Sequence, residues 1–179
     1  MLAAHMDEIG LMVKHVDEDG NISFSRIGGI DPWSMLTQRV RIKANSKEVM
    51  GVITTHRMAN NDPMSETLKV EDLYIDTCFT QKELLDMGVG TGTYISLVQE
   101  SGYMTDDKNV YGKALDDRIG CYILVELAKK LKHVTNEIYF VFTVQEEIGL
   151  YGAKTSAYKI KPNWAIAVDV TSSEDKGGK

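Results

Sequence analysis

The stretch RIGCYILVELAKKLKH (118–133), followed closely by EIYFVFTV (137–144), decides the fold class of this sequence. In the first segment apolar residues recur at every fourth position, namely Ile119, Ile123, Leu127 and Leu131. This spacing predicts an amphipathic helix, and its last turn is cationic. The second segment is a continuous apolar run, which is typical of a strand buried on both faces. A helix followed by such a strand predicts a parallel sheet covered by helices, and hence an α/β fold.

The neighbouring segments extend this pattern. EEIGLYGAKTSAY (146–158) predicts a loop and a helix, and NWAIAVDV (163–170) repeats the buried-strand pattern and ends near an aspartate. By contrast, residues 10–97 are β-rich. We therefore expect an α/β domain made of residues 1–9 and 98–179, interrupted by a β-rich domain at 10–97.

Within the β-rich region two local features stand out. IGLMVKHV (9–16) and ISFSRI (22–27) flank an Asp/Gly/Asn turn and predict a hairpin. The turn does not fit a calcium loop, because Ile22 stands where that loop needs glycine. QKELLDMG (81–88) predicts a single helix that ends at its glycine.

Composition limits the class of protein. The 179 residues are 43% hydrophobic and 26% charged with three prolines, which is typical of a globular protein. The net charge of −6, without a basic stripe, excludes nucleic acid as the main partner. Two distant cysteines form no CxxC pair, which favours the reducing cytoplasm. No apolar run reaches the roughly 18 residues of a membrane span.

Metal-binding residue types stand at the ends of four predicted elements. His5 follows the apolar run LAA, Asp116 precedes the long helix, Glu146 and Glu147 follow FVFTVQ, and Asp169 ends the last strand. Taken singly, Asp116 is also explained as a helix cap, the two glutamates as solvated loop charges, and His5 as a core histidine. Ligands of α/β sheets bind beyond the carboxyl ends of strands, so the coincidence of all four favours a site.

The residue types indicate metal chemistry. Imidazole and carboxylates suit zinc, cobalt or manganese. Asp7 lies on the same strand face as His5 and can accept its second ring N–H. Adjacent Glu146 and Glu147 can divide into one metal ligand and one general base that takes a proton from water. They suit a glycosidase less well, because its two carboxyl groups stand about 5 to 9.5 Å apart across a sugar.

Four ordered motifs resemble the tetrahedral aminopeptidase family, also called glutamyl or deblocking aminopeptidases, some members of which are labelled endoglucanase. They are AHMDEIGLMV (4–13), YGKALDDRIGC (111–121), VQEEIGLYGA (144–153) and AIAVDVTSS (165–173). The resemblance implies a phosphorylase/hydrolase-like metallopeptidase core with a mixed sheet flanked by helices. It also implies an inserted, barrel-like dimerisation domain, to which GVITTHR (51–57) and EDLYIDT (71–77) are similar.

The resemblance also implies roles for individual residues. His5, Asp116 and Asp169 are similar to the ligands of a first metal ion, Asp116 also bridges, and Glu147 is similar to a ligand of a second ion. Glu146 corresponds to the general base and Asp7 supports His5, whereas Asp117 and Arg118 have a structural role. The implied activity is a cytoplasmic, homo-oligomeric aminopeptidase that releases N-terminal residues from short peptides with two zinc or cobalt ions.

The sequence departs from the family at its ends. Family members carry more chain on both sides, including the second-metal histidine, and His15, His56 and His133 match no ligand motif. We therefore interpret the chain as a fragment that binds at most one zinc or cobalt ion tightly and has little or no aminopeptidase activity. The alternatives are a catalytically inactive scaffold or self-association fragment of the family and, more distantly, a glycoside hydrolase.

Overall fold

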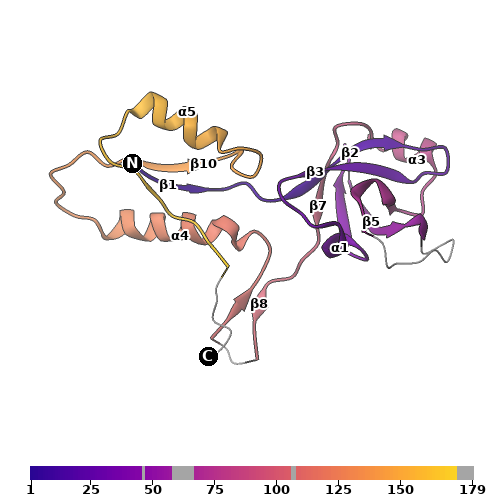
Figure 1. Ribbon diagram of the computed structural model, residues 1–179, viewed down its shortest axis with the longest axis horizontal. Coiled ribbons are helices and arrows are strands. Elements are labelled where there is room, and N and C mark those ends of the chain that lie inside the picture. Colours follow the sequence, from indigo (N-terminus) through magenta and orange to yellow (C-terminus); the bar gives the residue numbers. More distant parts are fainter. Residues whose placement is uncertain (46, 58–66, 106–107, 173–179) are drawn as a thin grey trace. The chain divides into compact units, whose positions relative to one another are not determined.

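The chain divides into two compact units. The computed structural model describes residues 1–45, 47–57, 67–105 and 108–172. Unit 1 comprises Met1–Glu8 and Ser101–Lys179, and unit 2 comprises Ile9–Glu100. Figure 1 shows the helices and strands of each unit in the colours of the sequence. Unit 2 is an insertion, because the chain leaves unit 1 and later returns to it.

Unit 2 is built around a closed barrel in which every strand pairing is antiparallel. Around the barrel the order is β2 (Gly10–Val16), β3 (Ile22–Ile27), β6 (Leu73–Asp76), β5 (Glu48–Thr55), β4 (Arg39–Lys43) and β7 (Tyr94–Leu97), which pairs with β2. Closure removes the free edges whose N–H and C=O groups would otherwise stay unpaired. The barrel-like architecture expected for the β-rich region is confirmed.

The predicted hairpin of β2 and β3 is also confirmed, and its turn explains the acidic residues there. The carboxylate of Asp17 accepts hydrogen bonds from the Asn21 backbone N–H at 2.8 Å and from the Asn21 side-chain amide at 3.1 Å. Gly20 has a φ of 87°, a left-handed conformation that glycine adopts without strain. These turn residues therefore serve the backbone.

The barrel interior is apolar because side chains alternate along each strand. In β4, Val40 and Ile42 are fully buried while Arg41 is exposed. In β5, Ile53 points inside and Met50 points outside. Other fully buried side chains of this core are Leu11, Val13, Ile22, Met35, Ile75, Leu84, Val89 and Ile95. Unit 2 therefore has a hydrophobic core of its own.

Short helices join the strands of unit 2. The predicted helix is α3 (Gln81–Asp86), and it begins with a reciprocal cap: Thr80 Oγ1 accepts from the Glu83 N–H at 3.4 Å, and Glu83 Oε2 accepts from the Thr80 N–H at 2.9 Å. The single turns α1 (Pro32–Met35) and η1 (Val70–Asp72) were not predicted, because one turn is too short to show a period.

Unit 1 contains a three-stranded sheet in the order β10 (Phe140–Thr143), β1 (Leu2–His5) and β11 (Ile166–Ala167). Both pairings are parallel. The predicted parallel pairing is confirmed, but no antiparallel strand joins this sheet within the described residues, so the mixed sheet is not seen there. A separate short hairpin, β8 (Gly102–Tyr103) and β9 (Val110–Tyr111), precedes the first long helix.

Helices cover both faces of this sheet. Helix α4 (Leu115–Lys130) packs on β1, and α5 (Tyr151–Ile160) packs on β10. Figure 1 shows the two helices on opposite sides of the strands. Because all three strands run in the same direction, their carboxyl ends lie at one edge of the sheet. His5 and the segments that follow β10 and β11 are thereby brought to the same place.

The apolar stripe predicted for α4 does not face the sheet, which corrects the sequence interpretation. The buried residues of α4 are Asp117, Gly120 and Leu124, whereas Ile119 is 39% exposed and Ile123 is 47% exposed. The reason is that α4 carries apolar residues on more than one face, and periodicity alone does not tell which of them packs. Likewise β10 and β11, predicted as buried, keep exposed residues at Phe142 and Ile166.

Within the described residues, no helix combines the length and the apolar character that crossing a membrane requires.

The barrel core gives a stability prediction. Replacing Ile53, which is fully buried in β5, by Ala is expected to lower the free energy of unfolding of unit 2 by about 2–5 kcal/mol, because it leaves a cavity. The matched change Glu48→Ala on the outer face of the same strand is expected to alter it by less than about 1 kcal/mol, because the exposed ion pair of Glu48 with Arg41 contributes little. Denaturant titration in a Trp164→Phe background, where Trp33 is the remaining tryptophan, measures this. Equal losses in both variants would contradict the observed inward and outward faces.

Candidate metal centre

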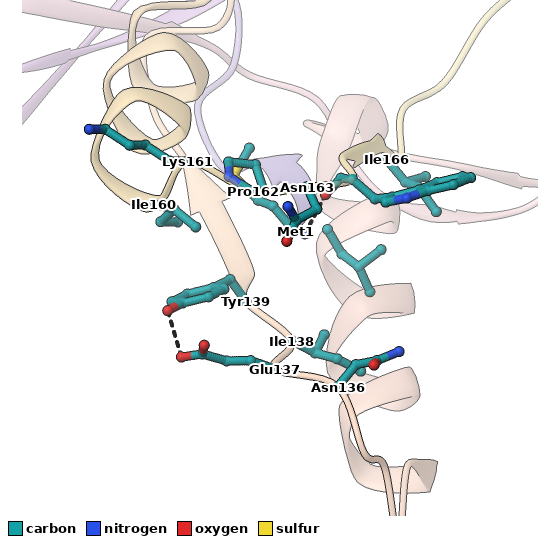
Figure 2. Close-up of a pocket in the computed structure, with 12 residues that line it drawn as sticks. Met1, Asn136, Glu137, Ile138, Tyr139, Ile160, Lys161, Pro162, Asn163 and Ile166 are labelled. Atoms are coloured by element: carbon teal, nitrogen blue, oxygen red, sulfur yellow. Dashed lines mark hydrogen bonds between the residues drawn. The ribbon is translucent and has the colours of Figure 1, made fainter.

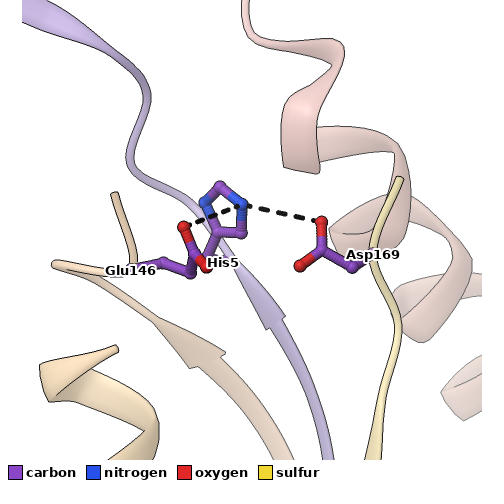
Figure 3. Close-up of side chains that lie close together, drawn as sticks. All are labelled: His5, Glu146 and Asp169. Atoms are coloured by element: carbon purple, nitrogen blue, oxygen red, sulfur yellow. Dashed lines mark ion pairs between the residues drawn. The ribbon is translucent and has the colours of Figure 1, made fainter. Parts of the chain in front are cut away.

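His5 lies at the centre of an acidic cluster at the carboxyl edge of the sheet. Its side chain is 3% exposed. Its Nε2 lies 3.0 Å from Asp116 Oδ1, 3.8 Å from Glu146 Oε2 and 3.8 Å from Asp169 Oδ1. Figure 3 shows Glu146 and Asp169 reaching toward the imidazole from the segments that follow β10 and β11. The structure thus brings together residues that are far apart in the sequence.

Two groups in this cluster have the donor set that a metal ion requires. One consists of His5, Glu146 and Asp169, and the other of His5, Asp116 and Glu147. In each group the possible ligand atoms lie within 4.8 Å of one another. One imidazole with carboxylates suits zinc, cobalt or manganese, so the residues present fit a divalent ion. All five residues that the sequence indicated as ligands or base belong to these groups.

Asp7 supports the site with both its backbone carbonyl and its carboxylate. The second ring nitrogen of His5, Nδ1, lies 3.1 Å from the backbone carbonyl of Asp7, whereas the Asp7 carboxylate is 3.5 Å away. That carboxylate instead accepts hydrogen bonds from the backbone N–H groups of Glu146 and Glu147, each at 3.2 Å. The support for His5 therefore comes from a carbonyl, and the carboxylate positions the two glutamates.

The segment after β10 forms a tight turn that presents both glutamates. The Glu146 carbonyl accepts from the N–H groups of Gly149 at 2.9 Å and Leu150 at 3.0 Å. Gln145 and Leu150 have positive φ angles of 61° and 63°, which reverse the chain before α5 begins. The two adjacent carboxylates are thus held at the sheet edge from both sides, by Asp7 and by the turn.

Asp116 and Asp117 take different positions at the head of α4. Asp116 is 59% exposed and its carboxylate faces His5, while Asp117 is fully buried. Asp117 Oδ1 accepts from the Gly120 N–H at 3.1 Å, which is the bond of a helix cap. The capping role considered for Asp116 therefore belongs to its neighbour, and Asp116 remains free to act as a ligand.

The cluster concentrates negative charge around one imidazole. Burial raises the pKa of Glu147, and the nearby charges of Asp116 and Glu146 raise it further. Burial by itself lowers the pKa of His5, but the Asp7 carbonyl and the surrounding carboxylates outweigh that effect and raise it. Such a cluster favours any added positive charge. A divalent cation meets this requirement.

The other histidines do not join this cluster within the described residues. His15 belongs to β2 and His56 stacks on Tyr74 with ring centroids 4.3 Å apart, both in unit 2. His133 is exposed beyond the end of α4 in unit 1. His5 is therefore the imidazole that both candidate groups share.

One contact in unit 1 was not predicted from the sequence, namely the ion pair of Lys113 with Glu8. Opposite charges so far apart in the sequence give no local signal.

A cavity of about 640 Å³ lies elsewhere in unit 1. It is lined by Met1, Tyr139, Trp164 and Ile166, among others, and so lies near the amino ends of the strands (Figure 2). Its polar side chains include Tyr139, whose hydroxyl donates to Glu137 at 2.6 Å. None of its lining residues belongs to the acidic cluster.

Comparison with known proteins establishes the family. The sequence profile of the M42 glutamyl aminopeptidase family matches residues 1–179, so the chain belongs to this family of peptidases. The resemblance inferred from the four motifs is thereby confirmed. Because M42 peptidases are metallopeptidases, family membership agrees with the donor set of the cluster.

Curated relatives extend beyond this chain. It is 42% identical over 175 residues to a protein of Acetivibrio thermocellus, which covers 98% of this chain and 51% of that protein. It is 33% identical to the lysyl aminopeptidase of Pyrococcus furiosus, covering 100% of this chain and 53% of that enzyme. The chain thus spans about half the length of the curated relatives it matches.

Solved structures share the fold. An aminopeptidase of Desulfurococcus kamchatkensis has a TM-score of 0.88 at 35% identity, covering 100% of this chain and 49% of that one. The TET1 peptidase of Pyrococcus horikoshii, described as assembling into a tetrahedron or an octahedral shell, has a TM-score of 0.80 at 32% identity, covering 94% and 52%. A Thermotoga maritima structure named endoglucanase has a TM-score of 0.73 at 32% identity, covering 98% and 50%.

The geometry of the cluster predicts which histidine binds metal. His5→Ala is expected to weaken Zn²⁺ or Co²⁺ binding by more than the roughly 10- to 100-fold typical of losing an outer-shell partner, because it removes the imidazole common to both groups. His133→Ala is the matched control, since this exposed histidine lies in the same unit outside the cluster. Calorimetric titration measures both affinity and stoichiometry. Two tight ions per chain, or one that survives the loss of His5, would contradict the assignment.

Proposed function

We propose that this chain provides a metal-dependent aminopeptidase centre that acts on the N-terminal residues of short peptides. The observation that carries the proposal is the cluster around His5, in which imidazole and carboxylate oxygens converge at the carboxyl edge of the sheet. Membership in the M42 glutamyl aminopeptidase family supports peptides as the substrate class.

The ligand roles follow from the donor atoms. His5, Asp116 and Asp169 would hold a first ion, since the two carboxylates lie 3.0 Å and 3.8 Å from His5 Nε2. Glu147 would hold a second ion together with Asp116, which then bridges the two. When bound, such ions supply a polarised water and stabilise negative charge on the carbonyl oxygen of the scissile peptide bond. Because the second position has carboxylates alone among the described residues, we expect at most one tightly bound ion.

Glu146 would act as the general base. Its Oε2 lies 3.8 Å from His5 Nε2, and its side chain is 27% exposed, so it is near the cluster and still open to substrate. The base takes a proton from the attacking water and returns it to the leaving amine. Asp7 fixes the base through the Glu146 N–H. The Glu146 carboxylate also belongs to one group with His5 and Asp169, so substitution of Glu146 distinguishes a base from a ligand.

A second candidate is a catalytically inactive scaffold of the family. The observation that favours it is the single imidazole shared by both candidate groups within the described residues. A centre with one tight ion lacks one of the two positive charges that stabilise the tetrahedral intermediate. Metal binding without turnover would identify this second candidate.

We also propose that copies of the chain associate through unit 2. Met50 and Val52 lie on the outer face of β5 and are 46% and 43% exposed. Exposed apolar groups on one surface favour contact with another protein. The assemblies described for the TET1 peptidase support homo-oligomers.

The free Cys78 and Cys121 support the cytoplasm as the compartment.

Substitution of the proposed base separates its two possible roles. Glu146→Gln is expected to leave Co²⁺ affinity nearly unchanged and to lower any hydrolysis of aminoacyl p-nitroanilides that the wild-type chain shows by about 10²–10⁴-fold, because the amide cannot take the proton. Calorimetry and a chromogenic assay measure the two effects. A parallel loss of metal affinity would show instead that Glu146 is a ligand.

The wild-type chain in the same assay decides between the candidate functions. Turnover that requires added Co²⁺ or Zn²⁺ supports the aminopeptidase, while tight metal binding without turnover of any aminoacyl p-nitroanilide supports the scaffold. A soluble glucan is the control substrate, and its hydrolysis would favour the glycosidase alternative.

Association through unit 2 gives another prediction. The chain is expected to form dimers or larger assemblies at micromolar concentration, and Met50→Lys/Val52→Lys is expected to dissociate them, because buried unpaired charges oppose an apolar contact. Ile119→Lys/Ile123→Lys is the matched control on the exposed face of α4 in unit 1. Light scattering measures the molecular mass. Dissociation by the α4 variant alone would assign the contact to unit 1, and a monomeric wild type would exclude association.

A further inference from the structure

Asp117 is a fully buried carboxylate to which the proposed function gives no part in catalysis. It belongs to neither group whose atoms could hold a metal ion. Its Oδ2 accepts from the His5 N–H at 3.2 Å, and its Oδ1 accepts from the Gly120 N–H at 3.1 Å. A helix cap does not need a buried carboxylate, because exposed caps perform the same task without the cost of desolvation. The bond to His5 therefore requires its own explanation.

Among the residues that the structure describes, no strand pairs with the main chain of His5 on the side that faces Asp117. The N–H groups of Leu2 in β1 and of Met6 directly after it donate toward β10, so the N–H and carbonyl of His5 point to the opposite side, toward β11. There the pairing with β11 involves only Leu2 and Ala3. The sheet has ended on that side before it reaches His5. The Asp117 carboxylate accepts the hydrogen bond from the His5 N–H that the carbonyl of a neighbouring strand would otherwise accept.

Cys121 binds the other polar main-chain group of His5, the carbonyl. Its thiol donates to the His5 carbonyl at 3.2 Å. Residues four apart lie on one face of a helix, so Asp117 and Cys121 are neighbours in the first turns of α4. Between them they satisfy both the N–H and the C=O of His5. Gly120 leaves the necessary room, because a Cβ at this position would collide with the Asp117 carboxylate.

We propose that Asp117, assisted by Cys121, is a positioning residue that fixes the His5 imidazole against the Asp116 carboxylate and thereby sets the metal affinity of the site. The inference rests on the proposed function, since it concerns a residue assigned there as a ligand. Its physical basis is that two adjacent residues contact different parts of His5. Asp116 Oδ1 lies 3.0 Å from His5 Nε2, and the Asp117 carboxylate accepts the hydrogen bond from the His5 main-chain N–H. A shift of α4 relative to β1 would change both of these contacts together.

Asp117→Asn tests the proposal with little change in shape. The amide offers one acceptor oxygen for two N–H groups, so one of them would face an NH₂ donor. We expect Co²⁺ affinity to fall about 10- to 100-fold, as on losing an outer-shell partner, and the visible absorption of bound Co²⁺ to change. Leu124→Ala is the control, because this fully buried residue of α4 has no hydrogen bond to His5 and its loss reduces stability only.

Cys121 provides a rescue experiment. Cys121→Ala removes the donor to the His5 carbonyl and is expected to weaken Co²⁺ binding, while Cys121→Ser keeps a donor and is expected to restore it. A purely structural role would give a different result. In that case Asp117→Asn, once corrected for the unfolded fraction, would bind Co²⁺ as Leu124→Ala does, and the proposal would be overturned.

Amide hydrogen exchange of the metal-free protein distinguishes failure of this inference from failure of the proposed function. The His5 amide is expected to exchange at least about 10-fold faster in Asp117→Asn than in Leu124→Ala, because a hydrogen bond to a charged group is lost. If the wild type binds no Co²⁺, the proposed function fails, and this exchange rate still reports whether Asp117 holds His5. Equal rates in the two variants would overturn the inference.

Discussion

The parallel pairing of β1 with β10 on one side and β11 on the other is the constraint on which the site depends. The register aligns His5 with Thr143, the last residue of β10, and aligns Ala3 with Ala167, the last residue of β11. The chain therefore leaves all three strands at the same edge, where the acidic side chains meet. A shift of β1 by one residue would turn His5 to the other face of the sheet, away from every carboxylate in the cluster.

Carboxylates in this site differ in whether their oxygens contact main-chain N–H groups, the His5 imidazole or both. Those of Asp7 and Asp117 accept main-chain N–H groups and so fix the backbone of the residues that face the centre. The Asp116 carboxylate faces His5 Nε2 instead, and Asp169 Oδ1 does both, because it lies 3.8 Å from His5 Nε2 and accepts the Val170 N–H at 2.8 Å. The backbone is thus held by hydrogen bonds, while the oxygens that crowd one imidazole remain available to a cation. Crowding without such holding would let the charged side chains move apart into solvent.

The sequence predicted the elements whose signals are local and failed where the answer depends on packing. The hairpin of β2 and β3 and the helices α3 and α4 follow from turn residues, caps and periodicity. The buried face of α4 does not, because Ile123 and Leu124 are equally apolar and only the position of β1 decides between them. The motifs indicated the residues of the cluster, but spacing could not tell that Asp7 meets His5 through its carbonyl. The cis peptide bond between Asp116 and Asp117 had no proline to indicate it.

The insertion of unit 2 places a particular demand on the contacts of β1. The chain leaves unit 1 after Glu8, directly after the residues that contribute to the site, and returns at Ser101. Unit 2 has a closed barrel and its own core, so its stability does not require β1 to be in place. Both strand partners of β1 come late in the chain, after α4. Helix α4 is therefore the earlier element that can hold the His5 main chain. Its buried Asp117 carboxylate and its Cys121 thiol, one turn later, make the hydrogen bonds to His5 that a neighbouring strand makes elsewhere in the sheet.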